Sequence, residues 1–276
     1  MKKPAFKRKW ANSHLLLVGS SDDPLIPVLQ REAKDSGHIV SLYLDNDEDE
    51  YFLANPKRVF HAVLVLDTDD LPTALTALPD YVLSHCATDC LFLINALTTT
   101  ATEVTSFFDS DQVARVVGFS PIALYAQKPV VELSRGRRTA SDALDSARLF
   151  FGSLDILTVE VPDVPGLILG RTLAMLVNEA ASALMEGVAT AEDIDTAMKL
   201  GTNYPEGPLR WADLVGLDVI SDILVNLFST YGERYAPVTL LNNMVNGGDL
   251  GYKSGRGFYA YAGRRARKAH LTLIKN

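Results

Sequence analysis

The segment GSSDDP, from Gly19 to Pro24, lies between the apolar run LLLVG at 15–19 and a helical pattern. A strand, a tight turn and a helix in this order form the cradle in which nucleotide-binding domains hold a phosphate at a helix N-terminus. Of the glycines in the fingerprint G-x-G-x-x-G only Gly19 is present, because Ser21 and Pro24 stand at the other two positions. Gly19 and Ser21 are therefore the candidate cofactor-binding residues of this turn.

Two aspartates change the chemistry that this turn offers. Asp23 followed by Pro24 is a favourable helix start, with Asp as the N-cap and Pro at the first helical position. The helix N-terminus carries about half a positive charge, and Asp22 and Asp23 supply anionic groups to it. A diphosphate within ~4 Å of one carboxylate meets a repulsion of several kcal/mol at an effective dielectric near 20. The turn is therefore predicted to be capped by its own side chains.

The acidic residue that holds a ribose in such sites follows the second strand. Leu44 occupies the expected position and Asp45 the next, so Asp45 is the third candidate cofactor contact. The acidic run at 47–50 comes directly behind it, and a run of this kind is usually a solvated loop. It adds negative charge near a site meant for a diphosphate. These residues by themselves argue against NAD binding in the usual mode.

The elements that position this turn come from an alternation of apolar runs and helical patterns in the first half of the chain. Near-continuous apolar strands separated by helices indicate a parallel sheet that is covered on both faces. The predicted strands are 15–19, 39–44, 62–67, 90–95, 113–119 and 130–134.

The alternation of apolar runs and helical patterns ends after the run LTVEVPDVPG at 157–166. A long, mostly apolar helix is predicted over 167–185, and a second helix follows with Thr190 as its N-cap and Gly201 as its end. The predicted fold class is α/β: a Rossmann-like, mostly parallel sheet domain at 1–162, then an all-helical C-terminal domain at 163–276. The boundary is placed near the two prolines at 162–165.

Composition excludes several classes of protein. At 47% hydrophobic and 22% charged residues the chain is typical of globular proteins, and no apolar run approaches the roughly 20 residues of a membrane helix. The net charge of −8 disfavours nucleic acid as a partner. The basic clusters at 2–9 and 264–268 are interpreted as solvated tails. Because the apolar stretch behind the first cluster is too short for a signal peptide, we expect a cytoplasmic protein that binds no membrane.

Two further motifs carry residue types that do chemistry. Cys86 and Cys90 lie in HCATDC, but their spacing is not the two-residue gap of redox or zinc motifs, and no second ligand pair exists. We interpret them as two reduced thiols and expect no metal. The turn GYKSGRGFYAY presents Lys253 and Arg256, either for a phosphate or CoA contact or as a structural turn anchored by its aromatic residues. The structural interpretation is favoured.

Three blocks in the second half resemble the C-terminal domain of the 3-hydroxyacyl-CoA dehydrogenase family. In the first half the resemblance continues through ARVVGF and VVELSRG. It implies a Rossmann domain, a helical domain that forms a homodimer, and NAD-dependent oxidation of a 3-hydroxyacyl-CoA in fatty-acid metabolism. The blocks are PGLILGRTLAMLVNEAASAL (165–184), DIDTAMKLGTNYPEGPLRWADLVGLDVISDIL (193–224) and LLNNMVNGGDLGYKSGRGFYAY (240–261).

The resemblance also assigns the active-site positions. The family uses a histidine as general base, a glutamate that orients it, and Ser and Asn side chains that hold the oxygen. In GFSPIALYAQKPVVEL, Glu132 matches the glutamate and Ser120 stands at the histidine. In INALTT, Asn95 is in register, and Leu97 or Thr98 stands at the serine. Glu132, Ser120, Thr98 and Asn95 are the candidate catalytic residues.

Several positions depart from the family pattern. A serine hydroxyl is no base near neutral pH, and losing a positioned base slows a reaction by ~10²- to 10⁴-fold. Glu132 then acts on its own or merely caps a strand end. Gly170 replaces the asparagine of the interdomain helix, and the short segment 45–59 replaces a long charged hairpin that helps to hold CoA.

Two functions remain open at this point. One is a 3-hydroxyacyl-CoA dehydrogenase whose NAD-dependent activity is weak or lost. The other is a non-catalytic homologue, a pseudoenzyme that serves as a dimeric scaffold or as the binding partner of an active paralogue. An acyl-CoA or a related small molecule is the expected ligand of either protein.

Overall fold

The computed structural model describes residue 10 and residues 12–44, 47–48, 59–66, 84–110 and 112–261. The chain divides into two compact units, which are Met1–Pro121 with Pro129–Leu167 (the first unit) and Ile122–Lys128 with Ile168–Asn276 (the second unit). The division after Leu167 lies a few residues beyond the predicted boundary. Leu167 is buried against Ala96 and Val161 of the first unit, so the chain leaves that unit only after this contact.

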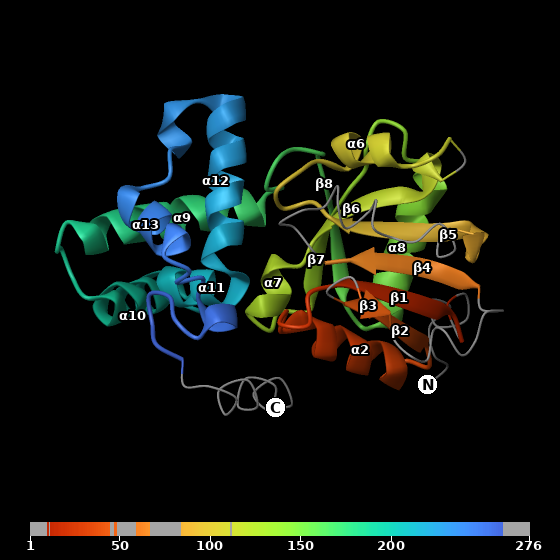
Figure 1. Cartoon of the computed structure of the whole chain (residues 1–276), viewed down its shortest axis with the longest axis horizontal. Coiled ribbons are helices and arrows are strands. Elements are labelled where there is room, and N and C mark those ends of the chain that lie inside the picture. The colour runs from red at the N-terminus through yellow and green to blue at the C-terminus, as the bar shows by residue number, and fades with distance from the viewer. Residues whose placement is uncertain are drawn as a thin grey trace. The chain divides into compact units, whose positions relative to one another are not determined.

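The first unit is built on one eight-stranded sheet with the order β3-β2-β1-β4-β5-β6-β7-β8 (Figure 1). The pairs β2–β3 and β6–β7 are antiparallel and the other neighbours are parallel. The prediction of a mostly parallel, Rossmann-like sheet is confirmed. The strands are β1 (His14–Gly19), β2 (Ile39–Leu44), β3 (Asp47–Glu48), β4 (Phe60–Val65), β5 (Cys86–Asn95), β6 (Val116–Ser120), β7 (Val130–Ser134) and β8 (Leu157–Val161).

Alternation along the strands gives the sheet two apolar faces. Leu16 and Val18 share one core cluster with Val104 and the neighbouring strands. On β6, Phe119 packs against Phe151 of helix α8 (Ser141–Ser153) with ring centroids 5.6 Å apart. Successive side chains of a strand point to opposite faces of the sheet. Since both faces are buried, nearly every position of these strands is apolar.

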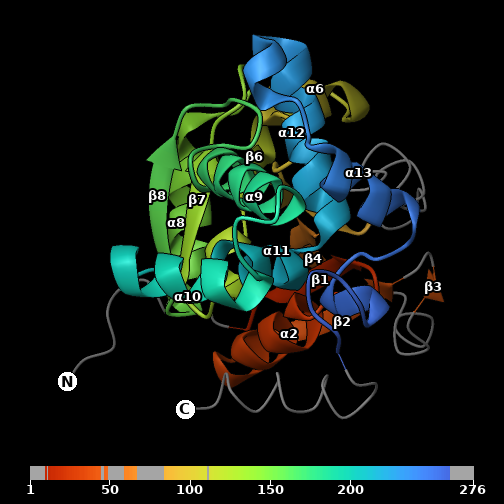
Figure 2. The ribbon, with the colours of Figure 1, turned by 90° about the vertical axis from the view of Figure 1, so that its left-hand side faces the viewer.

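Two longer helices cover the first unit's sheet. Helix α2 (Leu25–Asp35) contacts β1 and β2, and α8 (Ser141–Ser153) contacts β5 to β8 (Figure 2). The short helix α6 (Ala101–Val104) contacts β6. The strand predicted over 113–119 was wrong at its start, because residues 113–115 form a 3₁₀ turn. The N–H of Val113 bonds the carbonyl of Asp109 and not a neighbouring strand.

Helices make up the second unit, in which α9 contacts both α11 and α12 (Figure 1). Short α7 also belongs to this unit, and the indole Nε1 of Trp211 donates to the carbonyl of Ile122 at 3.3 Å. In the described residues no helix is both long and apolar enough to cross a membrane. The helices are α7 (Ile122–Tyr125), α9 (Leu169–Met185), α10 (Ala191–Thr202), α11 (Pro208–Val215), α12 (Leu217–Tyr231) and α13 (Thr239–Asn246).

The two ends of α10 test the sequence rules. Thr190 is the N-cap as predicted, because its side chain accepts from the N–H of Asp193. The predicted end at Gly201 was wrong. The helix continues to Thr202, and Asn203 ends it in the left-handed region with φ 57°. Asparagine adopts this conformation more readily than most side chains, so the glycine was not needed as the stop.

Candidate active site

The four predicted catalytic residues lie on, or just beyond, three neighbouring strands at one edge of the sheet. Asn95 ends β5, and Ser120 ends the parallel strand β6. Strand β7 runs antiparallel to β6, so its first half, with Glu132, returns to the same edge. Thr98 follows β5 by three positions. The four residues that the family resemblance assigned to the active site therefore lie together at the carboxyl edge of the sheet. α/β folds commonly bind ligands at this edge.

Ser120 and Glu132 are direct partners in the β6–β7 ladder. Directly opposed residues on antiparallel strands project from the same face with Cβ atoms about 4.5–5.5 Å apart. Ser120 is buried, at 2% exposure, while Glu132 is half-buried. The pair therefore places a carboxyl group beside a hydroxyl at the position where the resemblance expects a carboxyl group beside an imidazole.

The carboxamide of Asn95 is used to hold the sheet edge together. Its Nδ2 donates to the carbonyl of Leu66 at 2.9 Å, and its Oδ1 accepts from the N–H of Leu97 at 3.3 Å. These bonds tie the end of β4 to the end of β5. Of the two candidates for the serine position, Leu97 is buried at 1% exposure and Thr98 is half-buried, so Thr98 is the one with accessible surface.

Asp163, which the sequence analysis did not single out, fixes the loop between Asn95 and α6. Its carboxylate accepts from the N–H groups of Ala101 (2.8 Å) and Thr102 (2.9 Å) and from the Thr102 hydroxyl (2.6 Å). Gly118 of β6 lets this loop lie close, because a Cβ there would sit 3.1 Å from the Cβ atoms of Ala96 and Ala101. Asp163 is thus a positioning residue for the Asn95–Thr98 segment.

A depression of about 620 Å³ lies beside α6 in the first unit. Most of its polar lining is already committed, since Thr100 and Glu103 form a capping box and Asp163 holds the N–H groups of α6. None of the predicted site residues lines it. The lining residues are Thr100, Thr102, Glu103, Arg135, Gly136, Arg137, Thr139 and Asp163.

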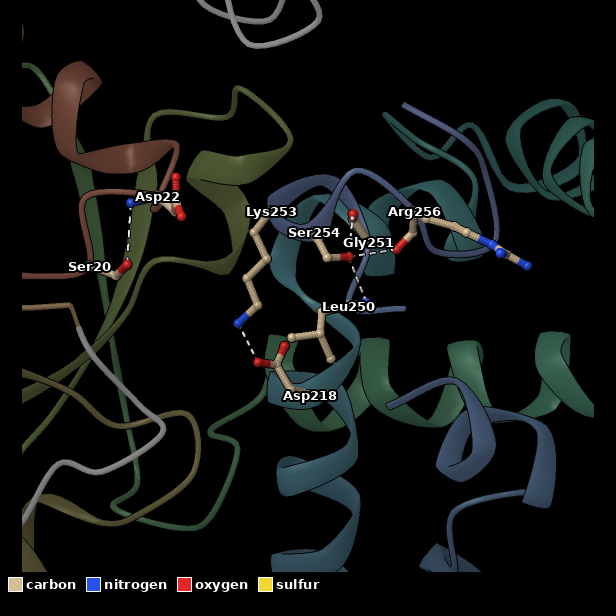
Figure 3. A network of polar contacts seen from close by, with 8 residues as sticks. All are labelled: Ser20, Asp22, Asp218, Leu250, Gly251, Lys253, Ser254 and Arg256. Carbon is tan, nitrogen blue, oxygen red and sulfur yellow. Dashed lines mark hydrogen bonds and ion pairs between the residues drawn. The ribbon is translucent and has the colours of Figure 1, made fainter. Parts of the chain in front are cut away.

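The turn after β1 is capped by its own aspartate. Asp23 Oδ1 accepts from the N–H of Leu25 at 2.8 Å, within the first turn of α2. The helix begins at Leu25 with Pro24 as its N-cap, one residue later than predicted. Asp22 is exposed, and its N–H donates to Ser20 Oγ at 3.3 Å (Figure 3). Asp23 therefore occupies the helix N-terminus as predicted.

These residues do not fit the pyrophosphate of NAD. Gly19 is buried at the end of β1 and Ser21 is exposed, but the turn between them and α2 carries two carboxylates. One of them already accepts a backbone N–H that a phosphate would use. Asp45, the third predicted cofactor contact, lies outside the described residues, as do the basic clusters at 2–9 and 264–268.

Every histidine that the structure describes lies at the opposite, amino edge of the sheet. His14 begins β1, and the other three precede or enter β2, β4 and β5. His14 Nε2 bonds Ser41 Oγ at 3.0 Å and His38 Nε2 bonds Ser153 Oγ at 3.0 Å, so both serve the core. Burial lowers the pKa of His38. His270 lies outside the described residues. No described imidazole is therefore placed beside Ser120 and Glu132.

In the second unit the glycine-rich turn is organised by a buried carboxylate. Asp213 of α11 is fully buried and accepts from the N–H groups of Phe258 (3.0 Å) and Tyr259 (2.9 Å) and from the Tyr261 hydroxyl (2.9 Å). A Cβ on Gly257 would lie 2.1 Å from Asp213 Oδ1, so only glycine allows this approach. Burial raises the pKa of Asp213 to about 6 against the opposing effect of these donors.

The two basic residues of the turn have carboxylate partners within this unit. Lys253 forms an ion pair with Asp218 of α12 (Figure 3), and Arg256 lies 3.4 Å from Asp249. The hydroxyl of Ser254 accepts from the N–H of Leu250 at 2.8 Å. These contacts support the structural interpretation of the turn over the phosphate or CoA contact.

A second buried carboxylate, Asp195 of α10, holds the start of α11. It accepts from the N–H groups of Leu209 and Arg210, both at 2.9 Å, and from the Tyr259 hydroxyl at 2.8 Å. A Cβ on Gly207 would lie 2.2 Å from its Cγ, which accounts for the glycine in NYPEGPL. At the position where the resemblance places an asparagine, Gly170 is buried within α9.

Comparison with known proteins agrees with this architecture. The model of the 3-hydroxyacyl-CoA dehydrogenase C-terminal domain matches residues 166–261. The 3-hydroxybutyryl-CoA dehydrogenase of Clostridioides difficile is 34% identical over 180 residues, which are 64% of this chain and 62% of the relative. The chain thus spans less than two thirds of that relative's length.

Two solved structures share the fold over nearly the whole chain. Mycobacterium tuberculosis FadB2 is 24% identical with a TM-score of 0.70, and the match covers 91% of this chain and 100% of that one. The (S)-3-hydroxybutyryl-CoA dehydrogenase PaaH1 of Ralstonia eutropha is 22% identical with a TM-score of 0.66 and the same coverage. Residues 166–261 therefore carry the C-terminal domain of the 3-hydroxyacyl-CoA dehydrogenase family, and the chain shares the fold of these dehydrogenases.

Proposed function

We propose that this chain is a non-catalytic member of its family, which has lost the hydride transfer and acts as a dimeric binding protein. The observation that carries the proposal is the position of the imidazoles. All four described histidines lie at the amino edge of the sheet, and buried Ser120 stands opposite Glu132 at the carboxyl edge. The family reaction needs a base at this point to take the hydroxyl proton of the substrate.

The magnitude of the loss supports this proposal. Removing a positioned base slows a reaction by ~10²- to 10⁴-fold, and a serine hydroxyl does not replace it near neutral pH. Asn95 offers no substitute, because both ends of its carboxamide hold the sheet edge. Gly170 contributes no side chain where the family has an asparagine. Each change weakens the same reaction, so their effects accumulate.

The cofactor turn supports the same conclusion. NAD is the cofactor that membership of the family implies, and its pyrophosphate would approach the first turn of α2. Asp23 Oδ1 already accepts the N–H of Leu25 there. Two unit charges ~4 Å apart repel by about 4 kcal/mol at an effective dielectric of 20, which weakens binding by roughly a thousandfold. We therefore propose that NAD does not bind to this chain in the family's usual mode.

A residual dehydrogenase is the second candidate function. The arrangement that favours it is the β6–β7 pair, which sets the Glu132 carboxyl group beside the Ser120 hydroxyl at a ligand-binding edge. In this alternative Glu132 takes the proton itself, and Thr98 donates a hydrogen bond to the substrate oxygen. The substrate would be a 3-hydroxyacyl-CoA or a related small molecule.

The helical unit offers a surface for a second copy of the chain. Val225, Phe228 and Tyr231 recur at every third position of α12 and are 46%, 41% and 44% exposed. Residues at this spacing share one face of a helix. The guanidinium of Arg171 lies over the Tyr231 ring, 4.5 Å from its centroid. We propose a homodimer through this face, since a stable dimer buries apolar surface of this kind.

Hydride transfer from NADH to acetoacetyl-CoA, followed by NADH absorbance, tests the loss of catalysis. Wild type is expected to give no turnover above a protein-free control, and Ser120→His alone is not expected to restore it, because the cofactor turn is unchanged. Turnover by wild type that disappears in Glu132→Gln would establish the residual dehydrogenase instead.

Sedimentation of the full chain tests the dimer. Phe228→Glu is expected to convert the dimer to a monomer, because it buries a charge in the proposed interface. Phe107→Glu is the matched control, since Phe107 is a comparably exposed phenylalanine (46%) in the first unit. A monomeric wild type, or a dimer that survives Phe228→Glu, would contradict the proposed interface.

A further inference from the structure

Strand β5 carries the two cysteines of the chain on an irregular stretch at its start. In the β4–β5 ladder Phe60 pairs with Cys86, and the next pair is Ala62 with Leu91. From the first pair to the second, β4 advances from 60 to 62 while β5 advances from 86 to 91. The extra residues of β5 form a bulge, and Thr88 and Asp89 at its middle are exposed.

The bulge brings the ends of the HCATDC motif together. A step of two residues along β4 spans ~6.6 Å, so the Cα atoms of Cys86 and Leu91 are about that far apart along the sheet. In a regular strand a separation of four residues would instead place Cys86 and Cys90 ~13 Å apart. The register therefore puts Cys90, which precedes Leu91 directly, near the Cα–Cα range of about 4.4–6.8 Å that a disulfide requires.

The side chains lie together as well as the backbones. The two thiols are close enough for each to shift the pKa of the other. Cys90 is buried at 1% exposure within a core cluster of the sheet, and half-buried Cys86 packs against the same cluster. Both thiols are reduced in this structure. The sequence predicted two reduced thiols but not this contact between them, because spacing along the sequence does not reveal a bulge.

The two sulfur atoms are chemically unequal. The hydrogen bond from Cys90 lowers the pKa of Cys86, while the same bond and burial raise the pKa of Cys90. Arg115 adds a positive charge near the pair, and its Nη2 donates to the carbonyl of Asp89 in the bulge at 3.3 Å. The more accessible thiol is thus the better nucleophile, and the buried thiol is placed to resolve the product.

We propose that Cys86 and Cys90 form a reversible intrachain disulfide when the protein meets hydrogen peroxide. The Cys86 thiolate attacks one peroxide oxygen, the O–O bond breaks, and the hydroxide that leaves takes up a proton to become water. Cys86 is then a sulfenic acid. The Cys90 sulfur attacks the Cys86 sulfur, the S–S bond forms as the S–O bond breaks, and the thiol proton leaves with the hydroxyl group as a second water. Two thiols lose two electrons, and one peroxide is reduced to two waters.

The modification is distinct from the proposed function. The bulge lies at the amino end of β5, whereas the candidate active site lies at the carboxyl end of the same strand. A dithiol reductant restores both thiols by thiol–disulfide exchange. The pair therefore adds a redox-sensitive site whether or not the chain retains any dehydrogenase activity.

Peroxide treatment of the full chain, followed by alkylation, digestion with trypsin and mass spectrometry, tests the proposal. The chain has two cysteines in all, and no Lys or Arg lies within 59–114, so one tryptic peptide ending at Arg115 carries both thiols. After peroxide this peptide is expected to lose the mass of two hydrogens and to accept no alkyl group. After a dithiol it is expected to accept two alkyl groups.

Single variants assign the roles of the two sulfur atoms. Cys90→Ser is expected to accumulate sulfenic acid on Cys86, detected with a sulfenic-acid trap. Cys86→Ser is expected to react about tenfold more slowly than Cys90→Ser, because the remaining thiol is buried. Circular dichroism confirms that both variants are folded, and the wild-type result stands without them.

Three results would overturn the proposal. The first is wild-type protein whose two thiols both remain open to alkylation after peroxide. The second is oxidation of Cys86 to a sulfinic acid while Cys90 still accepts an alkyl group. The third is a disulfide that links two chains, which appears as a dimer in non-reducing electrophoresis.

Discussion

The carboxylate of Asp213 is the most informative single group to remove from the second unit. It is fully buried and accepts three hydrogen bonds, from the N–H groups of Phe258 and Tyr259 and from the hydroxyl of Tyr261. In Asp213→Asn an NH₂ group replaces one acceptor oxygen and faces a backbone N–H. One buried donor then loses its acceptor, and we expect the free energy of unfolding to fall by about 1–3 kcal/mol.

The size of this loss depends on pH with a definite sign. Burial raises the pKa of Asp213 from 3.8 to about 6. A raised pKa means that the folded state favours the protonated acid, so this stabilisation is complete below pH 3.8 and is lost as pH rises through 6. The shift of about two units corresponds to ~3 kcal/mol. Because asparagine does not titrate, Asp213→Asn should destabilise the second unit more at pH 4 than at pH 7, by about 2–3 kcal/mol.

Urea unfolding measured at both pH values checks this prediction. The chain has two tryptophans, Trp10 in the first unit and Trp211 in the second, so a Trp10→Phe background lets fluorescence report the unfolding of the second unit. Glu233→Gln, which alters an exposed carboxyl group in the same unit, is the control and should show no such difference. An equal effect of Asp213→Asn at both pH values, or a larger one at pH 7, would refute the reasoning.

Three further predictions follow from the same kind of contact. Gly257→Ala should destabilise the second unit by ~1–3 kcal/mol in urea unfolding, because its Cβ would lie 2.1 Å from Asp213 Oδ1. Gly201→Ala should instead be stabilising, because Gly201 lies inside α10 with open space around it. Asp163→Ala should lose ~1–3 kcal/mol and speed hydrogen exchange of the first two N–H groups of α6, and unchanged exchange would contradict its positioning role. The imidazole of His38 should titrate below 6.5 by NMR, and a midpoint above 6.5 would contradict this prediction. Its contribution to stability is therefore present above pH 6.5 and is lost as pH falls through the lowered pKa. His38→Gln should remove this pH-dependent contribution.

Sequence predicted the elements whose signal is local. The strands β1, β2 and β7 were placed to within a residue, because buried parallel strands are continuous apolar runs. The N-cap at Thr190 was also predicted, since a capping residue bonds an N–H three positions away. Residues 113–115 were wrongly assigned to a strand, because an apolar run does not show that its first residues form a 3₁₀ turn.

Contacts between distant segments were beyond the reach of local patterns. Asp163 caps a helix about sixty positions earlier in the chain, and Asp213 binds a turn more than forty positions later. The residues around each aspartate in the sequence do not show that its carboxylate binds backbone N–H groups. The available signal came from glycines, since a Cβ on Gly207 would strike the carboxylate of Asp195 and a Cβ on Gly257 would strike that of Asp213. The meeting of Cys86 and Cys90 was hidden in the same way by a bulge.

The candidate active site was predictable only through resemblance. Nothing in the residue pattern joins Asn95 to Glu132, and the sheet order brings them to one edge. The self-capped turn is the exception, because Asp23 lies within two residues of the N–H that it binds, and this electrostatic feature could be predicted from the sequence alone.

Calorimetric titration of the full chain with NADH is the measurement that tests the central claim most directly. We expect no saturable binding at micromolar ligand, because the Asp23 carboxylate occupies the helix N-terminus that the pyrophosphate would need. If electrostatics is the reason, Asp22→Asn combined with Asp23→Asn should bind NADH more tightly than wild type. Saturable binding by wild type at micromolar NADH, with one ligand for each chain, would contradict the account.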